Sequence, residues 1–350
     1  MKWSRGPVLG RGSSATVSSA TTTSGDLFAV KSVDIQQAKI LQKEQHFLSI
    51  FNSPYVVSYK GCDITTENYK TYYNIFMDYM SRGSITDSIN HRINKRFNDL
   101  EIARYTRHVV QGLEYIHSIG IVHCDIKGRN ILIDEFGAKI GDFGCAKWCN
   151  QMEPITGTPM FMAPEVARGE EQGFPADIWA VGCTVIEMYT GGLPWPEVND
   201  PASVLYKIGF SGEIPGIPDE ICDEAKDFVA KCLIRDPKQR WTASELLKHP
   251  FVQQLDGDVQ QIVCETIGSD SPTSVLDQAV WDSMRESSSS LSLSLSLSSV
   301  GIDYGECDGI LLRQRIEQLA CKSEMGNWGS EKEDGDWVTI RVNGDGDGGR

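Results

Sequence analysis

The sequence predicts an α+β fold with a small β-rich lobe, a larger helical lobe and a largely disordered C-terminal tail. Strand composition dominates residues 1–80, helical periodicity dominates from Ser84 onward, and the composition changes after Phe251. We therefore expect one folded domain over residues 3–251 and a separate tail over residues 252–350.

The β-rich lobe is expected to contain several strands and one helix. Residues 8–19, 27–33, 56–59 and 72–77 have the β-branched and aromatic composition of strands. Residues 36–51 have helical spacing, with an apolar stripe formed by Ile40, Phe47, Leu48 and Phe51.

Helices are expected to dominate the second lobe. Residues 102–117 have an amphipathic pattern, and residues 223–233 and 242–248 follow as further helices. Residues 177–189 are apolar nearly all round, so we expect that helix to be buried.

A polar run at residues 123–130, His-Cys-Asp-Ile-Lys-Gly-Arg-Asn, is the most informative feature of the chain. Two short strands at residues 131–134 and 138–141 follow it, and then an Asp-Phe-Gly sequence that begins at Asp142. Asp125 and Asp142 should therefore lie on loops at either end of a small hairpin and face one site.

These residues suit phosphoryl transfer, which depends on positioning and charge neutralisation more than on covalent help from the protein. Asp125 can meet a substrate hydroxyl, and Lys127 can steady the phosphate. Asn130 and Asp142 can hold Mg²⁺. Four such residues in register argue against a chance match of both motifs.

Two further motifs lie in the β-rich lobe. Lys31 lies on a strand and is expected to contact phosphates, with Glu44 of the following helix as its partner; the alternative is two unrelated surface charges. The other motif is a glycine-rich turn whose backbone can approach phosphates, although ordinary Gly-Ser turns look similar. Its nucleotide-binding candidates are Leu9, Gly10, Arg11, Gly12, Ser13, Ser14, Ala15, Thr16 and Val17.

Together these motifs resemble those of the eukaryotic protein kinases over about residues 3–251. The Ala-Pro-Glu triplet that ends at Glu165 and the buried helix that begins at Asp177 match as well, and Arg240 is where kinases place the partner of that glutamate. The resemblance implies the bilobal protein kinase fold, with ATP and Mg²⁺ as cofactors.

The resemblance also implies roles for individual residues. Val17, Ala29 and Leu132 would enclose adenine, Met77 would be the gatekeeper, and residues 78–80, ending at Met80, would form the hinge. A stack across the two lobes would consist of Leu48, Tyr59, His123 and Phe143.

The specificity class can be read from the same region. Lys127, two residues after Asp125, resembles serine/threonine kinases. Residues 157–166 are similar to the Gly-Thr-Pro-x-Trp-Met-Ala-Pro-Glu-Val run of the MEKK-like MAP kinase kinase kinases, with Phe161 in place of Trp. Residues 53–57 and 128–130 resemble the plant members of that group.

Two substitutions depart from the family pattern. Ala15 replaces the third glycine of the turn, and Cys124 replaces the arginine that reads a phosphate on the activation loop. Cys124 is either a buried filler or a redox group. Cys145 could face the nucleotide or serve packing only, and Thr156 is a candidate phosphosite without an evident reader.

Charge and cysteine content limit the remaining classes. Residues 1–250 hold 26 Lys and Arg against 30 Asp and Glu, a net charge of −4; residues 251–350 hold 7 against 18, a net charge of −11. This balance argues against nucleic-acid binding, which needs a basic face. The ten cysteines contain no CxxC pair, and residues 1–7 lack an apolar signal core. We expect a soluble cytoplasmic or nuclear protein without membrane insertion.

The tail combines a Ser/Leu run at residues 287–299 with a Gly-, Asp- and Glu-rich end at residues 330–350. Such composition does not offset the entropy of ordering, which predicts disorder. Residues 274–284 begin with a capping box and continue at helical spacing. They predict either a short helix that packs on the helical lobe or binds a regulatory protein, or a transient helix.

The resemblance implies an ATP-dependent serine/threonine kinase that phosphorylates MAP kinase kinases in a stress or hormone cascade. One alternative is a serine/threonine kinase outside that cascade. Another is a pseudokinase scaffold, supported only by the departures at Ala15 and Cys124, since the expected base and metal ligands are all present.

Overall fold

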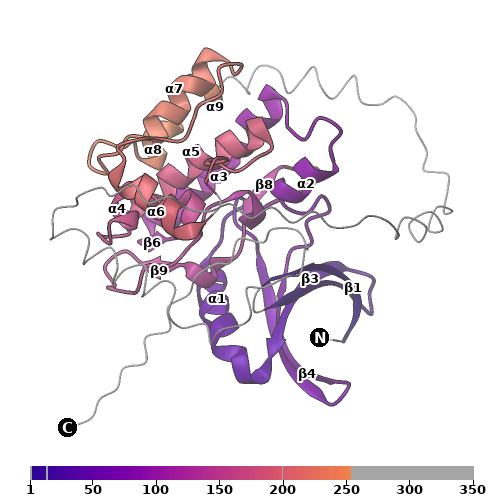
Figure 1. Ribbon diagram of the computed structural model, residues 1–350. Coiled ribbons are helices and arrows are strands. Elements are labelled where there is room, and N and C mark those ends of the chain that lie inside the picture. The colour runs from indigo at the N-terminus through magenta and orange to yellow at the C-terminus, as the bar shows by residue number, and fades with distance from the viewer. Residues whose placement is uncertain (1, 13–14, 199, 254–350) are drawn as a thin grey trace, which may run out of the picture.

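The computed structural model describes residues 2–12, 15–198 and 200–253, so the predicted tail and its candidate helix at residues 274–284 lie outside the described residues. The described chain forms two lobes, with the strands of the first lobe below and to the right of the helices of the second (Figure 1). This arrangement confirms the predicted α+β, two-lobed fold.

The first lobe is an antiparallel sheet with a helix beside it. Its strands, in spatial order, are β1 (Trp3–Arg11), β2 (Thr16–Thr22), β3 (Leu27–Asp34), β5 (Lys70–Met77) and β4 (Tyr59–Glu67).

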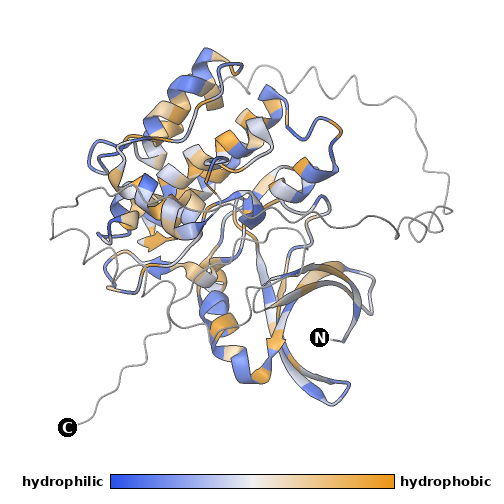
Figure 2. Cartoon of the chain, viewed as in Figure 1, coloured by the Kyte–Doolittle hydropathy of each residue, from blue (hydrophilic) through white to orange (hydrophobic). Residues whose placement is uncertain are grey.

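The helix of this lobe, α1 (Ala38–Ile50), follows a short 3-10 turn, Ile35–Gln37, which the Asp34 side chain caps. Hydrophobic and hydrophilic residues alternate along α1, as expected of a helix buried on one side (Figure 2). Its buried residues are Ala38, Leu41, Glu44, Phe47 and Leu48.

One strand prediction in this lobe is wrong. The sequence predicts a strand at residues 56–59, but β4 begins only at Tyr59. Val56 instead makes an isolated bridge with Ile140 of the second lobe, and Val57 N–H donates to Ile140 O at 2.9 Å. The extended segment therefore connects the two lobes and does not join the sheet.

The second lobe is built around α5 (Phe174–Thr190), in which every residue from Ala176 to Tyr189 is buried. α5 ends at Gly191, whose φ of 69° favours glycine. The other helices are α2 (Ile85–His91), α3 (Asp99–Ser118), α4 (Pro164–Ala167), α6 (Pro201–Phe210), α7 (Asp223–Cys232), α8 (Ala243–Leu246) and α9 (Pro250–Gln253).

The chain between α3 and α5 contains short strands and 3-10 turns. The strands are β6 (Ile121–Val122), β7 (Ile131–Ile133), β8 (Ala138–Ile140) and β9 (Lys147–Trp148). β7 and β8 form the predicted hairpin, and β6 pairs with β9. Single 3-10 turns cover Gly128–Asn130, Phe143–Cys145 and Pro159–Phe161.

One hydrophobic core joins the two lobes. It includes Leu48 of the first lobe and Phe143 of the second, and Tyr59 packs against it. The Phe143 ring lies 4.8 Å from the His123 ring and 4.6 Å from the Phe51 ring, measured between centroids. The four residues expected to stack across the lobes therefore lie in or against this core.

The folded unit extends to α9. Val252 is fully buried, and its carbonyl accepts a hydrogen bond from Arg107 Nη1 at 3.3 Å. Within the described residues, no helix has the length and apolar character that crossing a membrane requires.

Candidate active site

Lys31 lies between two carboxylates. β3 places its Nζ atom 2.6 Å from Glu44 Oε2 on α1 and 3.0 Å from Asp142 Oδ1. Burial disfavours the ammonium, but the charges of Asp142 and Glu44 outweigh this effect and raise the pKa of Lys31. The side chain is therefore a fixed cation, and the expected Lys31–Glu44 pair is present.

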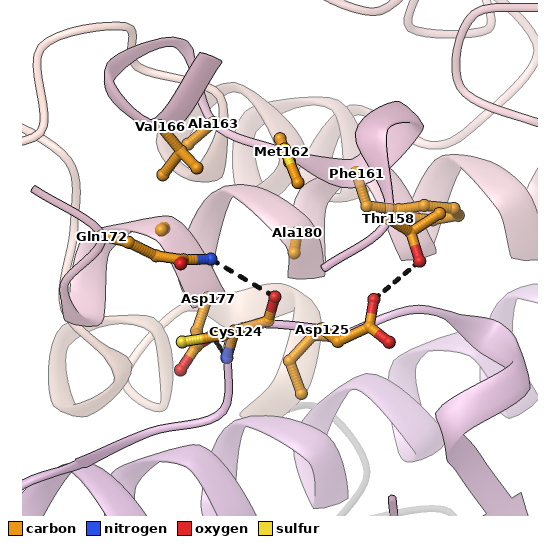
Figure 3. Close-up of a pocket in the computed structure, with 12 residues that line it drawn as sticks. Cys124, Asp125, Thr158, Phe161, Met162, Ala163, Val166, Gln172, Asp177 and Ala180 are labelled. Carbon is orange, nitrogen blue, oxygen red and sulfur yellow. Dashed lines mark hydrogen bonds between the residues drawn. The ribbon is translucent and has the colours of Figure 1, made fainter. Parts of the chain in front are cut away.

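Asp125 is the centre of a buried hydrogen-bond cluster. Its Oδ1 atom accepts a bond from Thr158 Oγ1 at 2.7 Å, shown in Figure 3, and its Oδ2 atom accepts one from Asn130 Nδ2 at 3.0 Å. Lys127 Nζ lies 2.7 Å from Thr158 Oγ1 and 3.0 Å from Asp125 Oδ2. The three expected catalytic residues are thus brought together.

Helix α5 holds the loop that carries Asp125 at both ends. Asp177 accepts the backbone N–H groups of His123 at 2.8 Å and Cys124 at 2.9 Å. Glu187 accepts the backbone N–H of Gly128 at 3.0 Å, and burial raises the pKa of its carboxyl. Two buried carboxylates on one helix therefore fix the geometry of the loop.

The sequence does not predict this role for either carboxylate; its pattern marks Asp177 only as the start of a buried helix. A glutamate inside an apolar helix, such as Glu187, could have been noticed, because a buried charge requires hydrogen-bond partners.

The glycine-rich turn connects β1 and β2. Gly10 pairs with Val17 and Arg11 with Thr16, and Gly12 N–H donates to Ala15 O at 2.8 Å. Among the described residues, nothing lies within 4 Å of a Cβ built on Gly10, so they leave room for a ligand beside its backbone. Ser13 and Ser14 lie outside the described residues.

The residues expected around adenine line the junction of the lobes. Ala29 of β3 pairs with Met77 of β5, and both are buried, as is Met80. Val17 and Leu132 are partly buried and pack against the same core. Leu9 is 48% exposed and is not among the described residues that pack against this core.

Asp78 anchors the expected hinge. Its carboxylate lies 3.0 Å from Lys60 Nζ and 2.7 Å from Lys139 Nζ. Burial opposes ionisation, but hydrogen bonds from Lys139 and Lys60 lower the pKa of Asp78 to about 2. The ion pairs connect the hinge to β4 and to β8.

The oxygen atoms expected to hold Mg²⁺ have suitable chemistry. Asp142 has a φ of 55°, and its side chain is 36% exposed. Asn130 donates through Nδ2, so its Oδ1 atom is the one that could bind a cation. In the described part of the chain, no cluster of three His, Cys, Asp or Glu side chains could hold a metal. A two-ligand site completed by phosphates and water suits Mg²⁺.

Glu165 and Arg240 form a buried ion pair. Arg240 Nη1 lies 2.7 Å from Glu165 Oε1, and Nη2 lies 2.9 Å from Oε2. Arg240 also donates to the carbonyls of Pro175 and Ile234. The pair ties the end of the activation segment, which we define as residues 142–165, to the segment at residues 234–240 that precedes α8, in the pairing expected from the sequence.

Cys124 and Cys145 lie in a small apolar cluster with Val122. Burial, with a contribution from the Asp177 charge, raises the pKa of the Cys124 thiol well above its ordinary value. Cys145 is 3% exposed. These surroundings favour packing roles for both thiols over the redox and nucleotide-facing alternatives.

Comparison with known proteins agrees with this geometry. The protein kinase domain family matches residues 3–252. The chain is 45% identical to Mitogen-activated protein kinase kinase kinase 17 of Arabidopsis thaliana over 350 residues, which cover 98% of this chain and 93% of the relative. It is 44% identical to kinase kinase kinase 18 of the same plant, over 98% of this chain and 100% of the relative. Mitogen-activated protein kinase kinase kinase A of Dictyostelium discoideum is 36% identical, over 74% of this chain and 29% of the relative.

Proposed function

This chain belongs to the protein kinase family and to its MAP kinase kinase kinase group, and we propose that it transfers the γ-phosphate of ATP to serine or threonine hydroxyls of MAP kinase kinases. The observation that carries the proposal is the pair of charge clusters, one around Asp125 and one around Lys31. They supply the two sides of a phosphoryl transfer.

On the acceptor side, Asp125 orients the substrate hydroxyl and accepts its proton. Asn130 and Lys127 hold the Asp125 carboxylate in place, and Lys127 neutralises charge on the transferred group. Loss of either the Asn130 or the Lys127 contact to Asp125 is expected to lower kcat, since positioning contributes most of the rate.

On the nucleotide side, Lys31 contacts the phosphates and Glu44 fixes the direction of its side chain. Asp142 and Asn130 would hold Mg²⁺, which neutralises charge on the phosphates when bound. The turn from Leu9 to Val17 covers the phosphates, and the residues at the lobe junction enclose adenine.

The two rival functions have less support. A pseudokinase would lack part of the catalytic set, whereas Lys31, Asp125, Asn130 and Asp142 are all present. A kinase outside the MAP kinase cascade is not favoured by the relatives, which are named as MAP kinase kinase kinases.

The test is transfer from radiolabelled ATP by the full chain to a panel of MAP kinase kinases whose own catalysis has been disabled. We expect labelling of at least one member and its loss, with the fold retained, in Asp142→Asn and Lys31→Met. The exposed Asp219→Asn is the matched control and should keep activity. Turnover by Asp142→Asn at the wild-type rate would contradict the assignment of the site.

The chain beyond residue 253 is proposed to be regulatory. The two Arabidopsis relatives match 98% of this chain, so the similarity continues past the kinase domain. The sequence predicts that the domain ends at Phe251, but Val252 is buried in it. The full chain is therefore best compared with a chain truncated after Gln253. The shortened protein should remain folded and active. The values of kcat and KM for a peptide and for an intact MAP kinase kinase should then differ between the two forms.

We also propose residence in the cytoplasm or the nucleus. The seven cysteines within the described residues are all free, as suits a reducing compartment. A fluorescent fusion viewed in plant cells tests this, and accumulation in the secretory pathway would contradict it.

A further inference from the structure

A buried glutamine connects the activation segment to the catalytic loop, which consists of residues 123–130. Gln172 lies between α4 and α5 and is 3% exposed. Its Nε2 atom donates to Thr156 O at 2.9 Å and to Cys124 O at 3.4 Å, and its Oε1 atom accepts Thr156 N–H at 3.3 Å. Figure 3 shows the bond to Cys124. The amide thus pairs with both backbone polar groups of Thr156.

The segment that Gln172 holds lies directly on the catalytic loop. Gly157 has a φ of 117°, and a Cβ built on it would lie only 2.3 Å from Cys124 O. The next residue is Thr158, whose hydroxyl bonds to Asp125. Only Gly157 separates Thr156 from Thr158. A displacement of Thr156 is therefore expected to move the Thr158 hydroxyl away from Asp125.

A second contact holds the preceding part of the same segment. Glu153 Oε2 lies 2.7 Å from Lys43 Nζ on α1, and Lys43 is the neighbour of Glu44, the partner of Lys31. Both side chains of this ion pair are about one-third exposed, so the buried Gln172 contacts are the stronger of the two anchors.

The glutamine amide is suited to this position in a way that a charged group is not. Two backbone carbonyls and one N–H must be satisfied together, and leaving them unpaired in a buried site is costly. A primary amide supplies the donors and the acceptor without a buried charge. A carboxylate at Gln172 would face two carbonyl oxygens.

We propose that Gln172 is a positioning residue for the transfer reaction: its amide docks Thr156 on the Cys124 backbone and so holds Thr158 against Asp125 without a phosphate on the segment. This inference rests on the proposed kinase function. It assigns the ordering of the activation segment to an unmodified side chain, which contacts the loop where Cys124 replaces the arginine of the family pattern.

The test compares variants of the full chain after phosphatase treatment. Gln172→Met keeps the side-chain length and removes all three bonds. We expect kcat for a protein substrate to fall roughly 10-fold or more, as for the loss of two or three buried hydrogen bonds. KM for ATP should stay within about twofold, because the Lys31 pair is not touched. Amide hydrogens of residues 153–158 should exchange faster.

Two controls separate positioning from other roles. Thr156→Ala keeps the backbone groups that Gln172 binds and removes only the 3.3 Å bond from the Thr156 hydroxyl to Cys145 O, so its kcat should stay within about twofold of wild type. If docking required a phosphate on Thr156, phosphatase treatment of wild type would itself remove the activity. Glu171→Met changes an exposed neighbour and should have no effect. If Gln172→Met does not fold, Gln172→Asn, which is one methylene shorter, is measured in its place.

The outcomes that overturn the inference are specific. An unchanged kcat per active site in Gln172→Met, with only a lower Tm, would make Gln172 a purely structural residue. Loss of wild-type activity on phosphatase treatment, restored when the segment is phosphorylated again, would assign the docking to a phosphate. A wild-type protein without any transfer activity contradicts the proposed function itself, which these variants do not test.

Discussion

The hydroxyl of Thr158 lies 2.7 Å from Oδ1 of Asp125 and accepts a bond from Lys127 Nζ at the same distance. A hydroxyl can donate to one group and accept from another at once, and this position requires both. The activation segment therefore places one of its own hydroxyls on the carboxylate that is proposed to meet the substrate hydroxyl.

Thr158→Val should lower kcat for a protein substrate roughly 10- to 100-fold. The hydroxyl that donates to Asp125 and accepts from Lys127 is lost, and both buried groups lose a hydrogen bond. KM for ATP should change little. Thr158→Ser keeps the hydroxyl and is expected to stay within about threefold of wild type. Steady-state kinetics on the three proteins check this, and equal loss in the Ser and Val variants would show that the methyl group matters more than the hydroxyl.

Arg240→Met should destabilise the domain by about 3–5 kcal/mol, because it leaves the Glu165 carboxylate buried without its partner. Arg240→Lys cannot make the two-point contact and should be intermediate. Lys226→Met, which breaks an exposed pair with Asp223, should cost less than about 1 kcal/mol. Urea denaturation of the four proteins measures these free energies, and similar losses for Arg240→Met and Lys226→Met would contradict the ranking.

The Cys124 thiol should be inert in the folded protein. Burial raises the pKa of its thiol and closes access to it, whereas Cys62 is exposed. After brief treatment with iodoacetamide at neutral pH, mass spectrometry should find Cys62 alkylated and Cys124 unmodified. Alkylation of Cys124 at a rate similar to that of Cys62 would revive the redox alternative.

Because of His108, the free energy of unfolding should decrease as the pH is lowered. Burial, together with the charges of Arg104 and Arg107, lowers the pKa of His108 from 6.5 to about 4. The unfolded chain therefore takes up this proton at a higher pH than the folded chain does. The contribution of His108 is fully present above pH 6.5 and is lost progressively as the pH falls to about 4.

The matched variant is His108→Asn, which cannot titrate but can still accept the Ala138 N–H that His108 Nδ1 accepts at 3.1 Å. The Tm of wild type should decrease more steeply between pH 6.5 and 4 than the Tm of the variant. Parallel curves would mean that His108 does not contribute to the acid sensitivity.

Elements with a strong period were predictable from the sequence. The helix predicted at residues 36–51 is found at Ala38–Ile50, and the one predicted at residues 177–189 is found at Phe174–Thr190. The segment at residues 56–59 was misplaced, because its strand-like composition serves a bridge to Ile140 that only the tertiary fold creates. α2 and α6 are not predicted as separate helices; α2 has only seven residues, which give little periodicity.

The site shows the same division. Lys31, Asp125, Asn130 and Asp142 could be named from motif spacing, because phosphoryl transfer requires those residue types. Gln172 could not, since its role depends on backbone groups of Thr156 and Cys124 that approach it through the fold. A glutamine before a glycine carries no such signal in the sequence.

The attachment of the catalytic loop to Asp177 and Glu187 has a consequence for motion. These residues lie on one helix about 15 Å apart, so the loop travels with α5 as a single rigid unit. Lys31 and Glu44 belong instead to the other lobe, on β3 and α1. Movement of the two lobes apart would stretch the Lys31–Asp142 contact, whereas the contacts of Asp125 with Asn130 and Lys127 lie within one lobe. The enzyme could therefore release nucleotide without disassembling the cluster around Asp125, the proposed proton acceptor, and each new cycle would begin with that half of the site already formed.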